Sequence, residues 1–446
     1  DDIYYTLGRS YATYLSLHRI NLSAVGRDNR LNGENYSKAF IQGLNDGGIN
    51  TFDLGLSLSQ IVYFSSYEFK TKGGAMLTAS HNSSEFNGLK LSTSYSETMV
   101  TEEIQQIRKI AESGKFSVGE GKNEPYDIFP AYQKDLLRYF NLKKKWKVVI
   151  DGCNNTSSLF YPKILRSAGC EVIEKNTNLD STFPLGMPDP TDTKVAERLA
   201  RETKEEGADI GFSYDADGDR IGVASEKGEI VWVDTVVALF AKSALKTFPG
   251  APIVFNTLCS RRVSETIRHA EGQPVMWLTG HSFIKVKVRE MRAPFGGELS
   301  GHMFFADNFY GYDDGAYASL RLLQYLDDES STLSQAVDQL PKYITSPEIK
   351  LKAADEIKFN LVGEKIKSDF HKLWPTATFT EIDGIRMDQN DRMAIVRASQ
   401  NGPYITVKFE GKTPEIYETL KNELRGILKK YPEIDWTVGT NIGSMN

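Results

Sequence analysis

Short runs of apolar, mostly β-branched residues alternate with longer stretches in which apolar positions recur every three or four residues. The short runs predict strands at 23–26, 50–54, 147–151, 170–173, 252–255 and 274–278. The longer stretches predict helices at 1–18, 36–44, 102–111, 161–167, 194–206, 234–245, 262–269 and 283–291. Strands separated by helices of this length predict βαβ units with mixed, mainly parallel sheets. The same alternation of strands and helices starts three times along the chain, which indicates an internal triplication.

The C-terminal part of the chain has a different pattern. Apolar runs predict strands at 348–351, 379–387, 393–397 and 404–409, with two helices between or after them. We therefore predict an α/β protein with three similar mixed α/β domains and a C-terminal α+β domain. The predicted domains are 1–126, 127–228, 229–343 and 344–446.

Length and composition fit an ordinary soluble globular protein. A chain of 446 residues is too long for one core, and no apolar run approaches the ~20 residues that a membrane span needs. The net charge of −6 gives no reason to expect a nucleic-acid partner, and we expect no membrane partner. Three cysteines without CxxC spacing predict neither a disulfide framework nor a zinc site, so we expect a cytoplasmic protein. We expect no signal peptide, because the segment after Asp1 is amphipathic rather than apolar.

The most informative motif places three carboxylates at alternate positions between two strand-like runs. Asp215, Asp217 and Asp219 repel one another unless a cation neutralises them, and carboxylate oxygens suit Mg²⁺. Arg220 follows directly and suggests an anionic partner such as a phosphate. An EF-hand is disfavoured because its loop needs glycine where Arg220 stands. A solvated acidic turn remains the alternative for this motif taken alone.

A second polar loop, Thr78-Ala79-Ser80-His81-Asn82, follows a small apolar run. Ser80 is a candidate nucleophile that needs a base or a metal for activation. Lys90, further along the same segment, can provide charge or act as an acid or base. An ordinary polar turn is the alternative interpretation.

Two later loops also carry candidate binding groups. Gly296-Gly297-Glu298-Leu299-Ser300-Gly301-His302 alternates Glu298, Ser300 and His302, which suits sugar hydroxyls, although a glycine-rich surface turn is the alternative. Around another turn, donor side chains make an anion cradle: Arg397, Ser399, Gln400 and Asn401.

The six histidines divide into two groups. His81, His281 and His302 fall in Gly- and Ser-rich loops. A separate polar segment, Val25-Gly26-Arg27-Asp28-Asn29-Arg30, follows the first predicted strand. The remaining histidines lie on predicted helices and are expected at the surface: His18, His269 and His371.

Taken in order, these loops resemble those of the α-D-phosphohexomutase superfamily, which carries a TASHN serine loop, a DGDGDR metal loop, a GEMSGH sugar loop and an RxSNTxP phosphate loop. The resemblance covers nearly the whole chain, and Gly-Glu-Leu-Ser-Gly-His is most similar to the bacterial phosphomannomutase/phosphoglucomutase branch. It implies four domains around a central cleft. It also implies interconversion of hexose 1- and 6-phosphates of mannose or glucose, through a phosphoserine and a 1,6-bisphosphate intermediate.

The resemblance also implies roles for individual residues and ligands. Ser80 would be the phosphoserine, and its phosphate oxygen would hold Mg²⁺ together with the three aspartates of the metal loop. Groups lining the reacting centre would be Lys90, Arg220, His281 and His302. Glu298 and Ser300 would bind the sugar hydroxyls. The non-reacting phosphate would be bound by four residues of the last loop: Arg397, Ser399, Gln400 and Asn401. A hexose 1,6-bisphosphate would act as activator, sugar phosphates would be the partners, and the enzyme would be a monomer or weak dimer.

Several departures from the family pattern affect detail. Ser83 replaces the usual Pro and predicts a less rigid serine loop, and Leu258 stands where Lys is common and removes a phosphate contact. The family's tyrosine- and arginine-bearing segment is absent before Asp1, which indicates truncation or disorder there. The alternatives are a phosphoglucosamine mutase, which Leu299 opposes because Gln is usual there, and a low-turnover sugar-phosphate-binding protein. A hydrolase that uses Ser80 as its nucleophile is a third and weaker alternative.

Overall fold

The computed structural model describes the chain from residue 1 to residue 446, except for the side chain of Thr93. The described residues form two compact units. The first unit contains Asp1–Pro190, Arg198–Glu229 and Asn308–Ser330, and the second contains Thr191–Glu197, Ile230–Asp307 and Ser331–Asn446. Among the described residues, every helix is too short or too polar to span a bilayer.

The first sheet of the first unit has a parallel centre and an antiparallel edge, in the order β5-β4-β3-β1-β2-β6. Its strands are β1 (Leu22–Arg27), β2 (Asn50–Leu56), β3 (Gly73–Leu77), β4 (Leu89–Ser94), β5 (Glu97–Thr98) and β6 (Asn123–Pro125). The accompanying helices are α1 (Asp2–Leu17), α2 (Gly33–Asp46), α3 (Ser59–Glu68) and α4 (Thr101–Ser113). β1 pairs in parallel with β2 and β3, and β4 runs antiparallel to β3.

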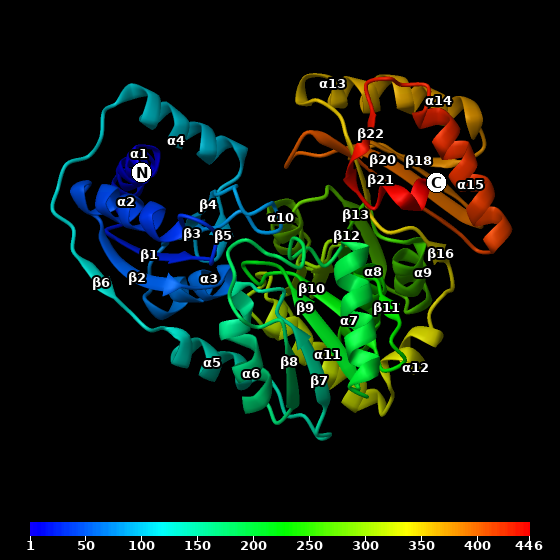
Figure 1. Cartoon of the computed structure of the whole chain (residues 1–446), viewed down its shortest axis with the longest axis horizontal. Coiled ribbons are helices and arrows are strands. Elements are labelled where there is room, and N and C mark those ends of the chain that lie inside the picture. The colour runs from blue at the N-terminus through cyan, green and yellow to red at the C-terminus, as the bar shows by residue number, and fades with distance from the viewer. The chain divides into compact units, whose positions relative to one another are not determined.

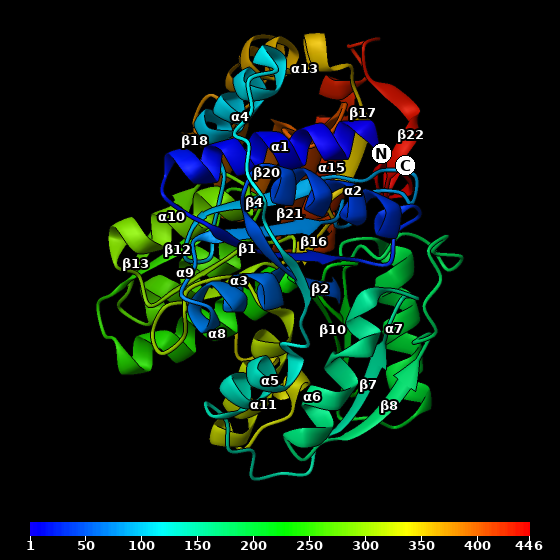
Figure 2. The same ribbon diagram turned by 90° about the vertical axis from the view of Figure 1, so that its left-hand side faces the viewer.

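Helices cover both faces of this sheet (Figures 1 and 2). Tyr11 and Leu15 of α1 pack with Phe40 of α2 against Val25 and Leu77 of the strands, and all five are buried. The amphipathic pattern predicts α1 and α2 because each has one apolar stripe facing this core.

The apolar pattern does not predict α3, because residues 59–66 are buried on every side of the helix and leave no polar stripe. α3 lies on the other face of the sheet, close to β1. A Cβ atom at Gly26 would lie 2.9 Å from Cγ2 of Val62, so this close approach requires glycine.

The same strand order recurs in two further sheets. One has the order β10-β9-β7-β8, and the other has the order β15-β14-β12-β13. Their strands are β7 (Lys147–Asp151), β8 (Glu171–Lys175), β9 (Ile210–Tyr214), β10 (Ile221–Ser225), β12 (Pro252–Asn256), β13 (Gln273–Trp277), β14 (Phe295–Gly297) and β15 (Met303–Phe305). In both, the first strand pairs in parallel with two neighbours, and the third pairs antiparallel with the fourth. This repetition confirms three similar mixed α/β folds, while the exact boundaries at 126, 228 and 343 stay predictions.

The helices of these segments include one, α11 (Gly315–Glu329), that belongs to a different compact unit from the helices just before and after it in the sequence. They are α5 (Phe129–Leu137), α6 (Tyr161–Ser167), α7 (Thr193–Glu205), α8 (Val233–Thr247), α9 (Arg261–His269), α10 (His281–Met291), α11 (Gly315–Glu329) and α12 (Leu333–Asp338), with the 3-10 turn η1 (Thr156–Leu159) and the short strand β11 (Ile230–Val231). α11 belongs to the first unit, although it lies within the predicted domain 229–343. At its start, Asp314 accepts a hydrogen bond from the Tyr132 hydroxyl at 2.7 Å.

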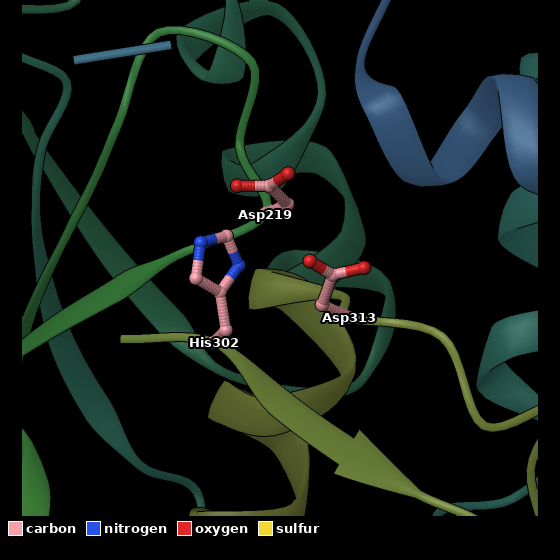
Figure 3. Close-up of side chains that lie close together, drawn as sticks. All are labelled: Asp219, His302 and Asp313. Carbon is pink, nitrogen blue, oxygen red and sulfur yellow. The ribbon is translucent and has the colours of Figure 1, made fainter. Parts of the chain in front are cut away.

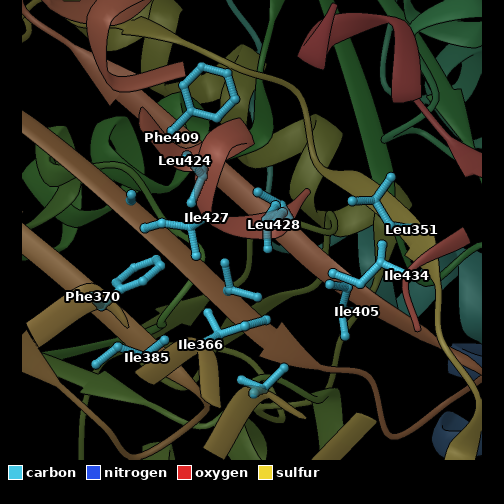
Figure 4. Packing of buried hydrophobic residues seen from close by; sticks show 14 of the residues in the cluster. Leu351, Ile366, Phe370, Ile385, Ile405, Phe409, Leu424, Ile427, Leu428 and Ile434 are labelled. Atoms are coloured by element: carbon cyan, nitrogen blue, oxygen red, sulfur yellow. The ribbon is translucent and has the colours of Figure 1, made fainter. Parts of the chain in front are cut away.

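The C-terminal segment folds as an antiparallel sheet covered by helices. Its order is β18-β19-β20-β21-β17-β22, and β16 pairs with β21. The elements are β16 (Ile344–Thr345), β17 (Ile349–Lys352), α13 (Asp355–Asn360), η2 (Leu361–Ile366), α14 (Lys367–Leu373), β18 (Thr378–Thr380), β19 (Ile385–Gln389), β20 (Arg392–Ala398), β21 (Tyr404–Gly411), α15 (Pro414–Leu428), β22 (Asp435–Thr440) and η3 (Ile442–Met445). Figure 4 shows its core, in which Ile385 and Ile405 of the sheet pack with Phe370 and Leu424 of the helices.

The prediction of one strand over 379–387 is wrong. β18 and β19 form an antiparallel hairpin in which Phe379 pairs with Met387. The chain reverses at Asp383-Gly384, where Gly384 has φ +82° and a Cβ atom would lie 2.3 Å from the carbonyl oxygen of Val396. An Asp-Gly pair inside an apolar run is a turn signal, and the reversal brings Asp383 to the hairpin tip.

Candidate active site

The serine loop follows β3 and holds Ser80 in an uncommon backbone conformation. Ser80 has φ +50°, and its amide donates a hydrogen bond to Oγ1 of Thr78 at 2.8 Å. Its hydroxyl donates to Oδ2 of Asp215 at 2.5 Å and lies 3.3 Å from Nδ1 of His81. A left-handed conformation at a non-glycine residue persists only where surrounding contacts maintain it, and such positions concentrate at functional sites.

A buried ion pair holds this loop in place through its backbone carbonyl oxygens. Asp28 and Arg30 follow β1, their side chains are 1% and 0% exposed, and Arg30 Nε lies 3.1 Å from Oδ2 of Asp28. Arg30 donates hydrogen bonds to the carbonyl oxygens of Ser80 and, at 2.7 Å, Ser83. Burial raises the pKa of Asp28 to about 6, although Arg30 and Thr78 act in the opposite direction. The loop is thus restrained at Ser83, the position where proline is usual.

The acidic loop joins the antiparallel strands β9 and β10. Asp215, Asp217 and Asp219 are buried and offer carboxylate oxygens that lie within 4.8 Å of one another. The tight return of the chain uses Gly218, which has φ +75°. A Cβ atom there would lie 2.7 Å from the Tyr161 hydroxyl, so only glycine fits between this loop and α6.

These three carboxylates can hold a metal ion. Among the residues that the structure describes, Oδ1 of Asp217 is buried without a hydrogen-bond partner. Burial and the charges of Asp217 and Asp219 raise the pKa of Asp215 well above its ordinary value. A hard cation coordinated by oxygen would satisfy the buried oxygen and neutralise the repulsion, so the residues fit an ion such as Mg²⁺.

Lys90 of β4 is the side chain that partly neutralises the acidic loop. Its Nζ lies 2.6 Å from Oδ2 of Asp217 and 2.5 Å from Oδ2 of Asp219. Ser59, at the start of α3, also donates to Oδ2 of Asp217 at 2.6 Å. Although burial lowers the pKa of Lys90, the two carboxylates raise it further, so the amine has a pKa well above its usual range.

Arg220 lies against the first carboxylate of the loop. Its amide donates to Oδ1 of Asp215 at 3.2 Å, and its Nε lies 3.6 Å from Oδ2. The side chain is largely buried, so its charge acts in a poorly hydrated place. The structure therefore brings Ser80, Lys90 and Arg220 together around the acidic loop, as the resemblance implied.

Asp313 is a further carboxylate beside this cluster, just before α11. Figure 3 shows Asp313 and Asp219 on neighbouring segments, and one oxygen of each lies within 4.8 Å of the other. Asp313 is fully buried. Its position adds a fourth negative group near Lys90.

In the second unit, the sugar loop follows β14 and is folded back on itself. Oε1 of Glu298 accepts a hydrogen bond from the amide of Gly280 at 2.6 Å, and Oε2 lies 3.3 Å from Oγ of Ser300. Gly280 has φ +136° and precedes α10. The ring of His281, the first residue of α10, lies 5.4 Å from that of His302 between centroids. Glu298, Ser300, His281 and His302 therefore form one polar cluster.

The phosphate loop lies at the end of β20. Nε of Arg397 donates to Oδ2 of Asp383 at 2.9 Å, and Oγ of Ser399 accepts from the amide of Asn401 at 3.1 Å. Gln400 and Asn401 are exposed at the tip. Arg397 is thus held by the hairpin tip, while the amide side chains face solvent.

Oδ2 of Asp383 also accepts hydrogen bonds from Oγ1 of Thr257 and the amide of Thr279, both at 3.0 Å. It therefore joins the phosphate loop to the segments that follow β12 and β13. Leu258, in the first of these segments, is 1% exposed, so its side chain packs inside the protein.

The expectation that His18, His269 and His371 lie at the surface is confirmed, because all three are exposed. Of the other histidines, His302 is buried, and His281 begins α10 instead of lying in a loop. Sequence reasoning did not assign roles to the supporting residues Asp28, Arg30, Ser59 and Asp313. For Asp28 and Arg30 the signal was available, because polar residues directly after a parallel strand share an edge with other strand ends. Ser59 carries no local signal, since its partner Asp217 lies 158 residues away.

Comparisons with known proteins show which family the chain belongs to. Models of phosphoglucomutase/phosphomannomutase α/β/α domains I, II and III match residues 1–118, 130–228 and 232–343. A phosphomannomutase/phosphoglucomutase of Pseudomonas aeruginosa is 36% identical over 95% of this chain and 91% of its own length. A Neisseria meningitidis phosphoglucomutase is 31% identical over 98% of this chain and 95% of its own length.

Among solved structures, a Burkholderia thailandensis protein of the phosphoglucomutase/phosphomannomutase family superposes with a TM-score of 0.86 at 29% identity. The match covers 96% of this chain and 93% of that one. Sequence, loop chemistry and fold lead to the same conclusion. The chain belongs to the phosphoglucomutase/phosphomannomutase family, in the bacterial branch of the α-D-phosphohexomutases.

Proposed function

We propose that this mutase of carbohydrate metabolism interconverts the 1- and 6-phosphates of glucose and mannose through a phosphoserine at Ser80. The observation that carries the proposal is the hydrogen bond from the Ser80 hydroxyl to Asp215, inside a buried cluster of carboxylates and cations. Phosphoryl transfer needs positioning and charge neutralisation more than covalent assistance, and this cluster offers both.

The proposed reaction keeps one phosphoryl group on the enzyme between turnovers. The phosphoryl group of phospho-Ser80 passes to the free hydroxyl of a hexose monophosphate, so the Oγ–P bond breaks and a sugar O–P bond forms. The resulting 1,6-bisphosphate turns end over end and returns its other phosphoryl group to Ser80. A hexose 1,6-bisphosphate added from outside enters the same cycle and phosphorylates an empty Ser80, so we propose it as the activator.

The residues proposed to hold Mg²⁺ are Asp215, Asp217, Asp219 and an oxygen of phospho-Ser80. When bound, the ion would neutralise charge on the transferring phosphoryl group. Lys90 and Arg220 supply fixed positive charge to the same phosphate oxygens, and Arg30 keeps the serine loop in place through its backbone carbonyls.

The second unit supplies the proposed recognition groups. Glu298 accepts hydrogen bonds from sugar hydroxyls with Ser300 beside it, and His281 and His302 are the imidazoles available for proton transfer at the reacting hydroxyl. Arg397, Ser399, Gln400 and Asn401 bind the non-reacting phosphate. This second site must accept either phosphate of the bisphosphate, which suits a loop whose amide side chains are exposed.

We further propose that the protein acts in the cytoplasm as a monomer or weak dimer with small sugar phosphates as its partners. A coupled assay with Mg²⁺ and glucose 1,6-bisphosphate tests the function on mannose, glucose and glucosamine 1-phosphates. Formation of glucose and mannose 6-phosphates would support the proposal. Conversion of glucosamine 1-phosphate alone, or of none of the three, would contradict it.

A further inference from the structure

A cavity of about 890 Å³ lies inside the second unit, away from the loops assigned above. One wall comes from β12, α9 and β13, and the other comes from the β18–β19 hairpin, the β19–β20 turn and the start of α15. None of the catalytic, sugar-binding or phosphate-binding residues proposed above lines it. Its volume lies within the range of sites that enclose a small organic ligand, roughly 300–1,000 Å³.

The hairpin presents an ordered polar face to this cavity. Thr378 pairs directly with Asp388, and Thr380 pairs with Arg386, so these four side chains stand on one face of the two strands. The intervening Phe379 and Met387 point into the domain core. This polar ladder offers the threonine hydroxyls to a ligand, whereas the buried Arg386 guanidinium is already engaged by both oxygens of Asp388.

The helix wall adds positive charge. Arg261, Ser264 and Arg268 recur at helical spacing along α9 and line the cavity. Arg261 is paired with Glu265 at 3.3 Å, whereas Arg268 has no ion-pair partner among the described residues and lies 3.4 Å from Oγ of Ser264. Arg268 is therefore the cation best placed to receive a phosphate group.

Apolar side chains line the space between these polar groups. Met276 of β13 and Ile416 of α15 are half-buried and border the cavity. A flat heterocycle is an apolar surface that such side chains can cover, while ribose hydroxyls suit the threonines of the hairpin and phosphates suit Arg268. These three features together describe a nucleoside diphosphate better than an inorganic ion.

The hairpin also connects the cavity to the phosphate loop. Nη1 of Arg386 donates to the carbonyl oxygens of Thr257 and Cys259, both at 2.6 Å. At the tip of the same hairpin, Asp383 holds Nε of Arg397 and accepts from Thr257. A ligand that shifts β18 and β19 would therefore shift the partner of Arg397.

We propose that this cavity is an effector site for a nucleoside diphosphate, whose binding changes the affinity of the Arg397 loop for sugar phosphate. Binding at the cavity is independent of the proposed mutase reaction. The effect on Arg397 rests on its proposed role as a phosphate ligand.

Isothermal titration calorimetry of the full chain, in EDTA to prevent binding through a metal, tests the site. The probes are adenosine, guanosine and uridine 5′-diphosphates, each alone, and inorganic phosphate. We expect at least one diphosphate to bind with one-to-one stoichiometry and more tightly than phosphate. Because Arg268 would make a charge-assisted hydrogen bond, Arg268→Ala should weaken that binding by about tenfold or more.

Thr378→Val tests the hairpin wall and should also weaken binding. Arg425→Ala, at the far end of α15 and outside the cavity, is the matched control and should bind like the wild type. Saturating glucose 1,6-bisphosphate should not displace the ligand. The proposal is overturned if no diphosphate binds the wild type, if neither cavity variant weakens binding, or if the bisphosphate competes.

The coupling is measured as the KM for glucose 1-phosphate with and without the bound diphosphate. We expect a change in KM for the wild type and for Arg425→Ala, and none for Arg268→Ala. An unchanged KM at saturating diphosphate would overturn the effector role. Absence of mutase activity would count against the proposed function but leave the calorimetric test intact, so the two failures are distinguishable.

Discussion

The hydroxyl of Ser80 donates a 2.5 Å hydrogen bond to Oδ2 of Asp215, a residue 135 positions further along the chain. This contact joins the loop after β3 to the acidic loop after β9. It places the proposed nucleophile beside the carboxylates proposed to hold the metal.

Replacing the nucleophile should abolish turnover without unfolding the protein. Because Ser80→Ala removes the oxygen that carries the phosphoryl group, we expect kcat to fall by at least about 10³-fold. The coupled glucose 1-phosphate assay measures this, and circular dichroism checks the fold. Activity near the wild-type level would exclude Ser80 as the nucleophile.

Asp217→Asn should weaken metal binding and activity together. The change removes one negative charge from the buried cluster, and we expect the affinity for Mg²⁺ to fall by about tenfold or more. Thermal unfolding measured over a range of Mg²⁺ concentrations reports binding independently of turnover, because a ligand that binds the folded state raises the melting temperature.

Glu197→Gln, an exposed carboxylate on α7, is the control for that experiment and should leave the Mg²⁺ titration unchanged. If Asp217→Asn showed the wild-type dependence on Mg²⁺ in both unfolding and activity, the acidic loop would not be the metal site.

Arg30→Ala should strongly destabilise the protein. It leaves Asp28 buried without its partner and removes the hydrogen bonds to the carbonyls of Ser80 and Ser83, so we expect a loss of about 3–5 kcal/mol in unfolding free energy. Urea denaturation at pH 7 measures it.

Two matched variants sharpen this test. Arg166→Ala breaks an exposed pair with Glu174 and should cost less than about 1 kcal/mol. The double variant Asp28→Asn/Arg30→Met should be more stable than Arg30→Ala, because it leaves no uncompensated buried charge. Equal stability of Arg30→Ala and Arg166→Ala would show that the buried pair does not support the loop.

Asp314 should make folding stability depend on pH. Burial raises its pKa to about 7, above the ordinary value of 3.8, so its contribution to stability is complete below pH 4 and is lost as pH rises through 7. Asp314→Asn should keep the hydrogen bonds with Tyr132 and the amide of Tyr317.

The wild type should therefore lose stability relative to Asp314→Asn between pH 5 and pH 7, by up to about 1.4 kcal/mol per pH unit, and the difference should level off above pH 7. Urea denaturation of both proteins at several pH values measures this difference. A difference that is constant across the range would mean that Asp314 titrates as an ordinary carboxyl.

The sequence pattern predicted helices that have one apolar face and strands that are short β-branched runs. Helices such as α1 and α2 follow from periodicity because each packs one side against a core, whereas β7 follows from its continuous apolar run, which is buried on both faces. α3 escapes this reasoning since it is buried all round, and the β18–β19 hairpin was predicted as one strand because its apolar residues continue through the turn. For α3, tertiary burial rather than local propensity decides the structure, whereas the hairpin follows from the local turn signal of Asp383-Gly384.

The sequence predicted the loop motifs of the site better than it predicted the residues that hold these loops in place. Ser80, Lys90, Asp217 and Arg220 stand in recognisable loops, and the structure gathers them into one cluster. The contacts of Ser59 with Asp217 and of Arg386 with Thr257 join segments that are more than a hundred residues apart. Such pairings depend on how strands are ordered in space, which no local pattern specifies.

The most direct test of the central claim is mass spectrometry of the protein after incubation with glucose 1,6-bisphosphate and Mg²⁺. The account predicts one added phosphoryl group, located on Ser80, which is retained during repeated turnover of glucose 1-phosphate because each turnover returns a phosphoryl group to Ser80. Turnover by a protein that carries no phosphoryl group on Ser80 at any stage would contradict it.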